Sequence, residues 1–340
     1  MTEPITHRSK QNSLIAFIFL LLAFPMFYFV YKFGTPYLGM IDFFDYYKLY
    51  ENMDYKSADS PLNMRLVGSF FVYCMNKMGL FYDTATQIDN APFEKRIYFN
   101  AVFFNYICVS LTSTSIFAIA RKLSHSVLMS FLGGLIYLLG FGTIFFGFMP
   151  LTDAFSMLLF SIAFGCYMQK SKFIHALFLV MIFQREYFFF AFGLIALIDF
   201  IKVREKYYLQ ILASTILCFV LYFIIRKTVF ETSRYAYQTD TQALLTGFMT
   251  LKFPLLPFIK QLAMTLNVFI LYFGIVLYKK WKRISYHQQN FVKVNLLFLQ
   301  LIALSFLLGL GNNSGRYFYM LTPMFIIYLL NELKVFKLEA

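Results

Sequence analysis

Long apolar runs, separated by short polar stretches, recur along the whole chain. Most of them have about 18 residues or more, which is enough for a helix to cross ~30 Å of hydrocarbon. Polar and apolar residues do not alternate within the runs, so transmembrane strands are excluded. The runs predict full crossings at residues 13–32, 97–119, 128–147, 151–168, 209–226, 261–278, 290–310 and 317–333.

This pattern predicts the fold class all-α. We expect a polytopic membrane protein that forms one domain over residues 1–340, with about nine full transmembrane helices. The first run, Leu14 to Tyr31, is too long for the core of a signal peptide, and no small-x-small cleavage site follows it. We therefore expect a retained anchor, followed by a long outer segment at 33–96 and a later outer loop at 227–258.

Two apolar segments do not fit simple crossings. Leu62 to Tyr82 is interrupted by Arg65, Asn76 and Lys77, and a crossing there would place the next basic loop outside. We therefore expect an amphipathic helix that lies on, or dips into, the outer leaflet.

The second segment, Phe173 to Phe200, has basic loops at both ends and Arg185-Glu186 in its middle. Its two arms have about 11 and 14 residues, and eleven helical residues rise only ~16 Å, about half of the membrane. A short cytoplasm-facing hairpin, with the charged pair at its tip, keeps both ends inside. The alternative is one long helix with a charge pair at mid-depth, which would invert every later crossing.

The formal net charge of +13 points to a membrane topology and not to a nucleic-acid partner. Only 14% of the residues are charged, against about 25% in an ordinary soluble domain. The basic residues gather in short loops, as the positive-inside rule requires, although Arg226-Lys227 breaks the rule. We therefore expect a multi-pass protein of the bacterial plasma membrane, with both termini in the cytoplasm. The basic segments are His7 to Lys10, Arg121-Lys122, Lys170 to Lys172, Lys202 to Lys206, Lys279 to Arg283 and Lys334 to Lys337.

The cysteines and histidines do not indicate a metal site. The four cysteines lie in or beside apolar runs without paired spacing, and the four histidines are scattered. Neither set has the spacing of zinc ligands. We expect the cysteines to be core residues.

The acidic residues are concentrated in one part of the chain, since eight of the seventeen lie between Asp42 and Glu94. An ionisable group at membrane depth costs roughly 2.5–3.5 kcal/mol on insertion scales, so such groups are functional candidates. The predicted topology places a set of mixed sign together on the outer side. Its members are Asp42, Asp45, Arg65, Asp153, Arg185, Glu186 and Arg316.

Each candidate also has a structural interpretation. Asp42 and Asp45 fit loop carboxylates, and Asp153 fits a helix start that the helix dipole favours. Arg185 and Glu186 fit mutual pairing with other buried groups, whereas Arg316 fits a side chain that snorkels to the interface. The nearby tyrosines Tyr46, Tyr47 and Tyr50 fit an interfacial aromatic belt.

Several short motifs occur in an order that is typical of a known family. They are Asp42 with Tyr46, Pro61 with Arg65, Arg121-Lys122-Leu123, Thr152-Asp153, Arg185-Glu186, and Gly315-Arg316-Tyr317 ahead of Pro323. In this order the chain resembles the polytopic GT-C glycosyltransferases, the group that includes protein mannosyltransferases and the aminoarabinose transferase of lipid A. The resemblance covers about residues 13 to 330. Unlike the larger members, the chain is expected to carry no soluble domain after the last predicted crossing.

The resemblance implies an inverting glycosyltransferase that uses a lipid-phosphate sugar donor. The catalytic base of that family is a carboxylate in the first loop, which corresponds to Asp42, with Asp45 as the second candidate. Donor-binding candidates are Arg65, Asp153, Arg185, Glu186, Arg316 and Tyr317. The implied partners are a polyprenyl-phosphate sugar donor, membrane lipids, and a glycan, lipid or protein acceptor. No cofactor is required with certainty, and a divalent cation stays an open option.

Elementary chemistry fits the same roles. Transfer needs a carboxylate that accepts the acceptor's proton, for which Asp42 is placed, and fixed cations beside the departing phosphate, such as Arg316 and Arg185. Asp153 or Glu186 would hold sugar hydroxyls or the acceptor. The 46 phenylalanines supply apolar surface for a lipid tail in an aromatic groove.

Two other functions remain open on the sequence. A polysaccharide polymerase or ligase also uses outward-facing arginines and carboxylates on multispan helices. A transporter or flippase of lipid-linked sugar is a different class. Against transport, the sequence has no internal repeat and no matching pair of Gly/Pro-broken helices.

Overall fold

The computed structural model describes residues 5–33, 40–59, 62–79, 94–230, 259–260, 263, 267–307 and 314–336. Within these ranges the chain forms helices and turns, and no strand occurs. The N-terminal half contains α1 (Ile5–Phe33), α2 (Met40–Asn52), η1 (Leu62–Met64), α3 (Leu66–Lys77), α4 (Lys95–Lys122), α5 (Val127–Leu138), η2 (Thr143–Gly147) and α6 (Asp153–Met168). The C-terminal half contains α7 (Phe173–Ile182), α8 (Tyr187–Val203), α9 (Lys206–Val229), α12 (Asn267–Trp281), α13 (Gln288–Leu307), α14 (Ser314–Met320) and α15 (Thr322–Phe336).

Three of the described helices are long and apolar enough to cross a membrane: α1 from Gln11, α4 and α9. Helices α5, α6 and α7 are apolar but shorter. The all-helical class is therefore confirmed for the described residues, and the long apolar helices are typical of a membrane protein.

Helix α1 packs along α4 through aromatic rings. Phe27 stacks on Tyr106 with ring centroids 5.0 Å apart, and the Tyr98 hydroxyl donates to the Val30 carbonyl oxygen at 2.8 Å. The opposite face of α1 exposes large apolar side chains such as Leu14 and Phe17. An exposed apolar face of this kind suits contact with lipid.

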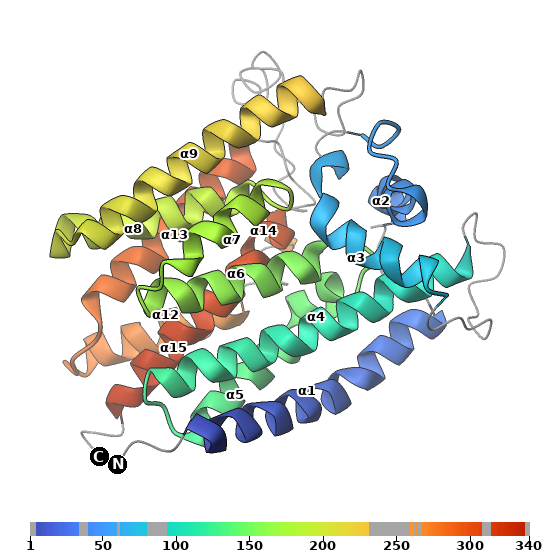
Figure 1. The fold of residues 1–340 in the computed structure, drawn as a ribbon. Coiled ribbons are helices and arrows are strands. Elements are labelled where there is room, and N and C mark those ends of the chain that lie inside the picture. Colours follow the sequence, from blue (N-terminus) through green and yellow to red (C-terminus); the bar gives the residue numbers. More distant parts are fainter. Residues whose placement is uncertain are drawn as a thin grey trace.

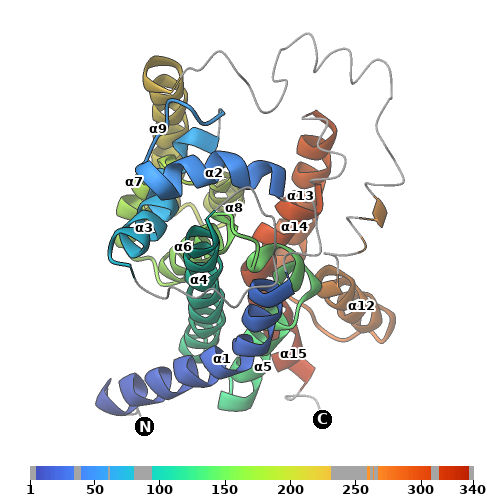
Figure 2. The ribbon, with the colours of Figure 1, turned by 90° about the vertical axis from the view of Figure 1, so that its right-hand side faces the viewer.

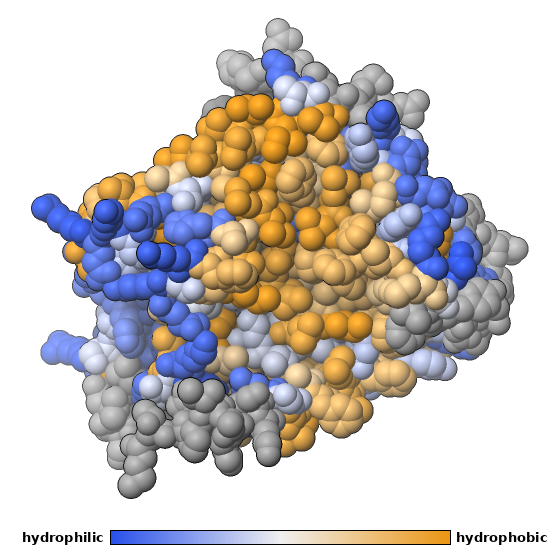
Figure 3. Space-filling model, viewed as in Figure 1, coloured by the Kyte–Doolittle hydropathy of each residue, from blue (hydrophilic) through white to orange (hydrophobic). Residues whose placement is uncertain are grey.

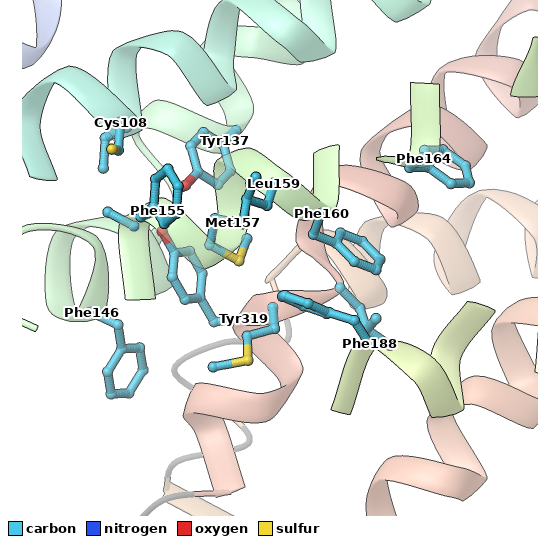
Figure 4. Close-up of a cluster of buried hydrophobic side chains, with 14 of the residues drawn as sticks. Cys108, Tyr137, Phe146, Phe155, Met157, Leu159, Phe160, Phe164, Phe188 and Tyr319 are labelled. Atoms are coloured by element: carbon cyan, nitrogen blue, oxygen red, sulfur yellow. The ribbon is translucent and has the colours of Figure 1, made fainter. Parts of the chain in front are cut away.

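Helices α4 and α6 lie in the middle of the bundle, with α1 and α5 on one side and α8 and α9 on the other (Figure 1), and Figure 2 gives the view from the side. Small residues allow close approach, since a Cβ on Gly165 of α6 would lie 3.1 Å from Ile119 Cγ1 of α4. On its other side, Phe160 of α6 meets Phe188 of α8, with centroids 4.9 Å apart (Figure 4). Helix α6 carries polar side chains at both ends, Asp153 at its start and Tyr167 near its end.

The segment 173–200 is broken at its middle, as the predicted hairpin requires and one continuous helix would not allow. Helix α7 ends at Ile182 and α8 begins at Tyr187. The two ends of the hairpin lie together, because Lys170 ahead of α7 forms an ion pair with Glu205 after α8. The tip at Arg185 lies at the opposite end of α6 and contacts its first residue, Asp153. The hairpin therefore extends along the whole of α6, farther than its arm length alone indicated.

The basic loops converge at one end of the bundle. Lys122, after α4, donates to Gln169 after α6, at 2.6 Å, and Lys334 near the end of α15 donates to the Leu123 carbonyl at 3.3 Å. Helix α1 begins and α15 ends on this same side (Figure 1). In Figure 3 an apolar field covers the middle of the molecule, with hydrophilic residues where α8 meets α9 and again beside α2 and α3. We call the end of the bundle where the basic loops converge the basic end. The end that carries α2 and α3 is called the opposite end.

The predicted crossing at 128–147 is not one continuous α-helix. Helix α5 ends at Leu138, and a π-helical turn follows at Thr143–Gly147. Gly142 and Gly147 let the Tyr319 ring approach this turn, since a Cβ on Gly142 would lie 2.7 Å from Tyr319 Cδ2. π-Helical turns occur frequently at functional sites.

The first predicted outer segment contains helices. It includes α2, η1 and α3, and α3 coincides with the expected outer-leaflet helix. Pro61, residues 80–93 and most of the expected outer loop at 227–258 lie outside the described residues.

Candidate functional site

Four predicted residues meet at the opposite end in a buried cluster of ion pairs. Asp153, the first residue of α6, is fully buried and uses both carboxylate oxygens. Its Oδ1 accepts from Arg185 Nη2 at the hairpin tip, and its Oδ2 accepts from Arg316 Nε on α14. Asp42 on α2 completes the set, because its Oδ2 accepts from Arg316 Nη1 at 2.8 Å. We call Asp42, Asp153, Arg185 and Arg316 the ionic cluster.

A third guanidinium lies beside this cluster. Arg65, buried just before α3, donates from Nη1 to the Tyr46 hydroxyl. Tyr46 follows Asp42 by one turn of α2, and Arg65 contributes electrostatically to the ionisation of Asp42. Three cations therefore surround two carboxylates.

Buried polar contacts fix the loop that leads into Asp153. The Tyr50 hydroxyl donates to the Pro150 carbonyl at 3.2 Å, and Asn105 Nδ2 donates to the Leu151 carbonyl at 2.8 Å. These contacts tie the loop to α2 and to α4. The position of Asp153 is thus set by neighbouring helices and not by its own helix alone.

Gln184 performs a similar task for Arg185. Its Nε2 donates to the Thr152 carbonyl at 3.0 Å and to Ser156 Oγ at 2.9 Å. Its Oε1 accepts from the Gly68 backbone N–H at 3.1 Å. One buried amide therefore joins the hairpin tip to α6 and α3, next to the guanidinium that contacts Asp153.

Burial and charge act against each other on Asp42. Burial alone would raise the pKa of its carboxyl, but Arg316, by charge and hydrogen bond, together with Arg65 and Arg185, lowers the pKa below its usual value. The carboxylate is therefore ionised at neutral pH and is a weaker base than a free aspartate.

Three other predicted residues lie near the ionic cluster but outside it. Asp45 pairs with Lys48 at 3.1 Å and accepts from the Asp59 backbone N–H at 3.2 Å. Tyr317 packs edge-on against Tyr187, with ring centroids 5.5 Å apart.

Glu186 directly follows the hairpin tip, is half-buried and precedes α8.

Sequence reasoning missed two kinds of residue. Tyr46 fitted an aromatic belt, yet it is buried against Arg65, and its spacing of one turn from Asp42 was the available signal. Gln184 received no role, although it is a polar residue inside an apolar run, which was also a signal.

A second set of buried charges lies at the basic end. Lys293 of α13 forms an ion pair with Asp199 of α8 at 2.7 Å, and Tyr167 of α6 also donates to this carboxylate. Lys279 of α12 pairs with Glu332 of α15 at 2.9 Å, and both are fully buried. The sequence pattern assigns Lys279 to a basic loop and gives no role to Lys293, Asp199 or Glu332, so their burial in ion pairs was not predicted.

A divalent cation does not fit the ionic cluster. Both of its carboxylates already bind guanidinium groups, and the three arginines leave the surroundings of Asp42 and Asp153 positive. In the part of the chain that the structure describes, no three His, Cys, Asp or Glu side chains gather as metal ligands.

The chemical capacity of the site follows from its composition. A buried excess of positive charge, with guanidinium forks, suits an anion such as a phosphate. An ionised carboxylate at the edge suits proton acceptance. Comparisons of the chain with protein families, with curated proteins and with solved structures found no significant match.

Proposed function

We propose that this protein is a membrane glycosyltransferase of GT-C type. It would move a sugar from a polyprenyl-phosphate donor to a glycan, lipid or protein acceptor of the cell envelope. The observation that carries the proposal is the ionic cluster, together with Arg65, buried at the end opposite to the basic loops. A phosphate at the headgroup level would meet three guanidinium groups and one partly exposed carboxylate there.

The proposed topology follows from the two ends of the bundle. By the positive-inside rule the basic end faces the cytoplasm of a bacterial plasma membrane, and the ionic cluster faces outward. An odd number of crossings would separate the termini, so we propose eight full crossings in place of about nine, with the α7–α8 hairpin between them. A helix that is shorter than the hydrocarbon thickness is accommodated by local thinning of the bilayer.

The reaction assigns one task to each side of the cluster. The acceptor oxygen attacks the anomeric carbon and passes its proton to Asp42, while the bond from that carbon to the phosphate oxygen breaks. The electron pair of this bond goes to the phosphate, whose growing charge is stabilised by Arg316, Arg185 and Arg65. Attack opposite the leaving group inverts the configuration at the anomeric carbon.

An open groove supplies a place for the lipid tail. A cavity of about 290 Å³ lies between α8, α9 and α13. Its lining includes Phe189 and Phe190, which follow Arg185 by about one turn, and Phe219, whose ring is 4.6 Å from that of Phe190. An apolar groove that starts one turn from a phosphate-binding arginine suits a polyprenyl chain.

The test uses the purified protein in liposomes of bacterial lipid with a panel of polyprenyl-phosphate sugars labelled in the sugar. We expect release of polyprenyl phosphate with one donor, and transfer of label when envelope extract is added. Asp45→Asn is the matched control and should retain activity, because Asp45 pairs with half-exposed Lys48 outside the cluster. Absence of both binding and turnover with every lipid-phosphate donor would refute the function.

One observation favours a transporter as the second candidate. Helix α6 has buried carboxyl groups at both ends, Asp153 at one and that of Asp199 beside Tyr167 at the other. Charged side chains at both ends of a central helix are compatible with a transport pathway along that helix. The same liposomes decide, since a flippase moves a fluorescent lipid-linked sugar between leaflets without breaking its phosphate bond.

A further inference from the structure

The two carboxylates bound to Arg316 differ in how firmly they are held. Asp153 is fully buried and shared between Arg316 Nε and Arg185 Nη2. Asp42 makes one ion pair with Arg316 Nη1 at 2.8 Å, and its side chain is 25% exposed. Releasing Asp153 would leave a buried charge without its partners, whereas water can solvate a released Asp42. Asp42 is therefore the exchangeable ligand of Arg316.

We propose that Asp42 holds the phosphate position on Arg316 when no donor is bound, and that the donor phosphate displaces it. This inference rests on the proposed glycosyltransfer. The phosphate takes the guanidinium edge at Nη1, and Asp42 turns toward the acceptor side. The base is then freed only when a donor is in place.

The charge count of the site is consistent with this exchange. Arg65, Arg185 and Arg316 against Asp42 and Asp153 leave one positive charge, which attracts an anion. A phosphodiester donor carries one negative charge, so the occupied site is neutral overall. No charge has to leave the protein for the donor to enter.

The exchange also changes the strength of the base. In the free protein Arg316 is the nearest cation that lowers the pKa of Asp42. Once phosphate neutralises Arg316, that influence weakens and the pKa of Asp42 rises toward its usual value. A carboxylate that is poorly basic in the empty site thus becomes a better proton acceptor in the loaded site.

The first experiment measures binding of a short-chain polyprenyl phosphate to the wild type, Asp42→Asn and Asp45→Asn. Removing the competing carboxylate should tighten binding to Asp42→Asn by about tenfold or more, the size of one charge-assisted contact. Asp45→Asn should bind like the wild type. Unchanged or weaker binding to a folded Asp42→Asn overturns the exchange.

Two further probes identify what is recognised. The matching polyprenol, which lacks phosphate, should bind the wild type and Asp42→Asn equally and weakly. Inorganic phosphate should show the same preference for Asp42→Asn with much lower affinity. If inorganic phosphate binds as tightly as polyprenyl phosphate, the proposal that the ligand is a lipid-linked phosphate is wrong.

The second experiment uses the wild type alone, so it does not depend on the folding of a variant. The acid limb of kcat/KM for the donor reports Asp42 in the free protein, and that of kcat reports it in the donor complex. Because activity is lost as pH falls through the pKa of the base, the exchange places the kcat limb at the higher pH. Coincident limbs, or the reverse order, would overturn it. A protein that transfers sugar with coincident limbs keeps its function and loses only the exchange.

Discussion

Replacing Asp153 by Asn should destabilise the folded protein strongly. The change keeps the size of the side chain and removes the charge that neutralises Arg185 and Arg316. Breaking a buried ion pair costs about 3–5 kcal/mol, because the remaining charge stays buried without compensation. The unfolded fraction should therefore rise roughly 10²- to 10⁴-fold, since each 1.4 kcal/mol is a factor of ten.

The same replacement at Asp45 provides the scale. Asp45 pairs with Lys48, whose side chain is half-exposed, and such pairs contribute roughly 0.2–1 kcal/mol. Asp153→Asn should lower the unfolding temperature by on the order of 5–10 °C, and Asp45→Asn by no more than about 2 °C.

The assay follows a thiol-reactive fluorescent dye during heating in detergent. Cys108 and Cys218 are buried and become reactive when the bundle opens. A double-mutant cycle completes the measurement, because Arg185→Gln should cost much less in the Asp153→Asn background than in the wild type. Equal unfolding temperatures for Asp153→Asn and Asp45→Asn, or additive costs in the cycle, would refute the ionic cluster.

Three more predictions address the rest of the molecule. Arg316→Lys should lose turnover because lysine cannot bind a phosphate in the bidentate way of a guanidinium. Arg316→Ala should lose turnover and also bind polyprenyl phosphate more weakly. If Arg316→Lys equals the wild type in turnover and in binding, Arg316 is an interfacial anchor. With the native cysteines replaced, an impermeant maleimide added to intact cells should label Glu51→Cys and not Lys280→Cys, and the reverse pattern would invert the topology. Lys279→Met should lower the unfolding temperature because it removes the buried ammonium that pairs with Glu332 and leaves this buried carboxylate with its contacts to His287. The surviving folded fraction should keep its KM for the donor, so a raised KM would show that this pair reaches the site.

The members of the ionic cluster were predictable because an ionisable side chain in or beside an apolar run has a high free-energy cost of membrane insertion. Asp153, Arg185 and Arg316 lie next to or within apolar runs, where an ionised group needs a partner. Loop charge placed all three at one end together with Asp42, and the structure joins them there. Composition and topology were therefore enough to include these four residues among seven charged candidates, but not to separate them from Asp45, Arg65 and Glu186.

The pairings themselves were not predictable, because they depend on how each helix is rotated. Asp42 and Asp45 lie on one helix three residues apart, yet only Asp42 contacts Arg316, while Asp45 contacts Lys48. The sequence pattern placed this stretch in an outer segment and did not predict that it forms a helix, or how such a helix would be rotated. The separate roles of the two carboxylates could follow only from the packing of α2.

The buried pairs at the basic end were hidden by the same rule that revealed the topology. Lys279 counts as a positive loop charge whether it is exposed or buried, and Lys293 lies inside the predicted crossing at 290–310, where the sequence names no partner for it. Their burial depends on Glu332 and Asp199, which lie 53 and 94 residues away from them in the chain. Only tertiary packing brings such distant residues together.

The long sequence separations within the ionic cluster fix the order in which it can be assembled during synthesis. Arg185 is synthesised only 32 residues after Asp153, so this ion pair can form before most of the C-terminal half has been synthesised. Arg316 is made 163 residues after Asp153 and 274 after Asp42, and it joins both. A nascent chain therefore contains Asp42, Asp153 and Arg185 before it contains Arg316. The complete ionic cluster can form only after the last helices have been synthesised and inserted.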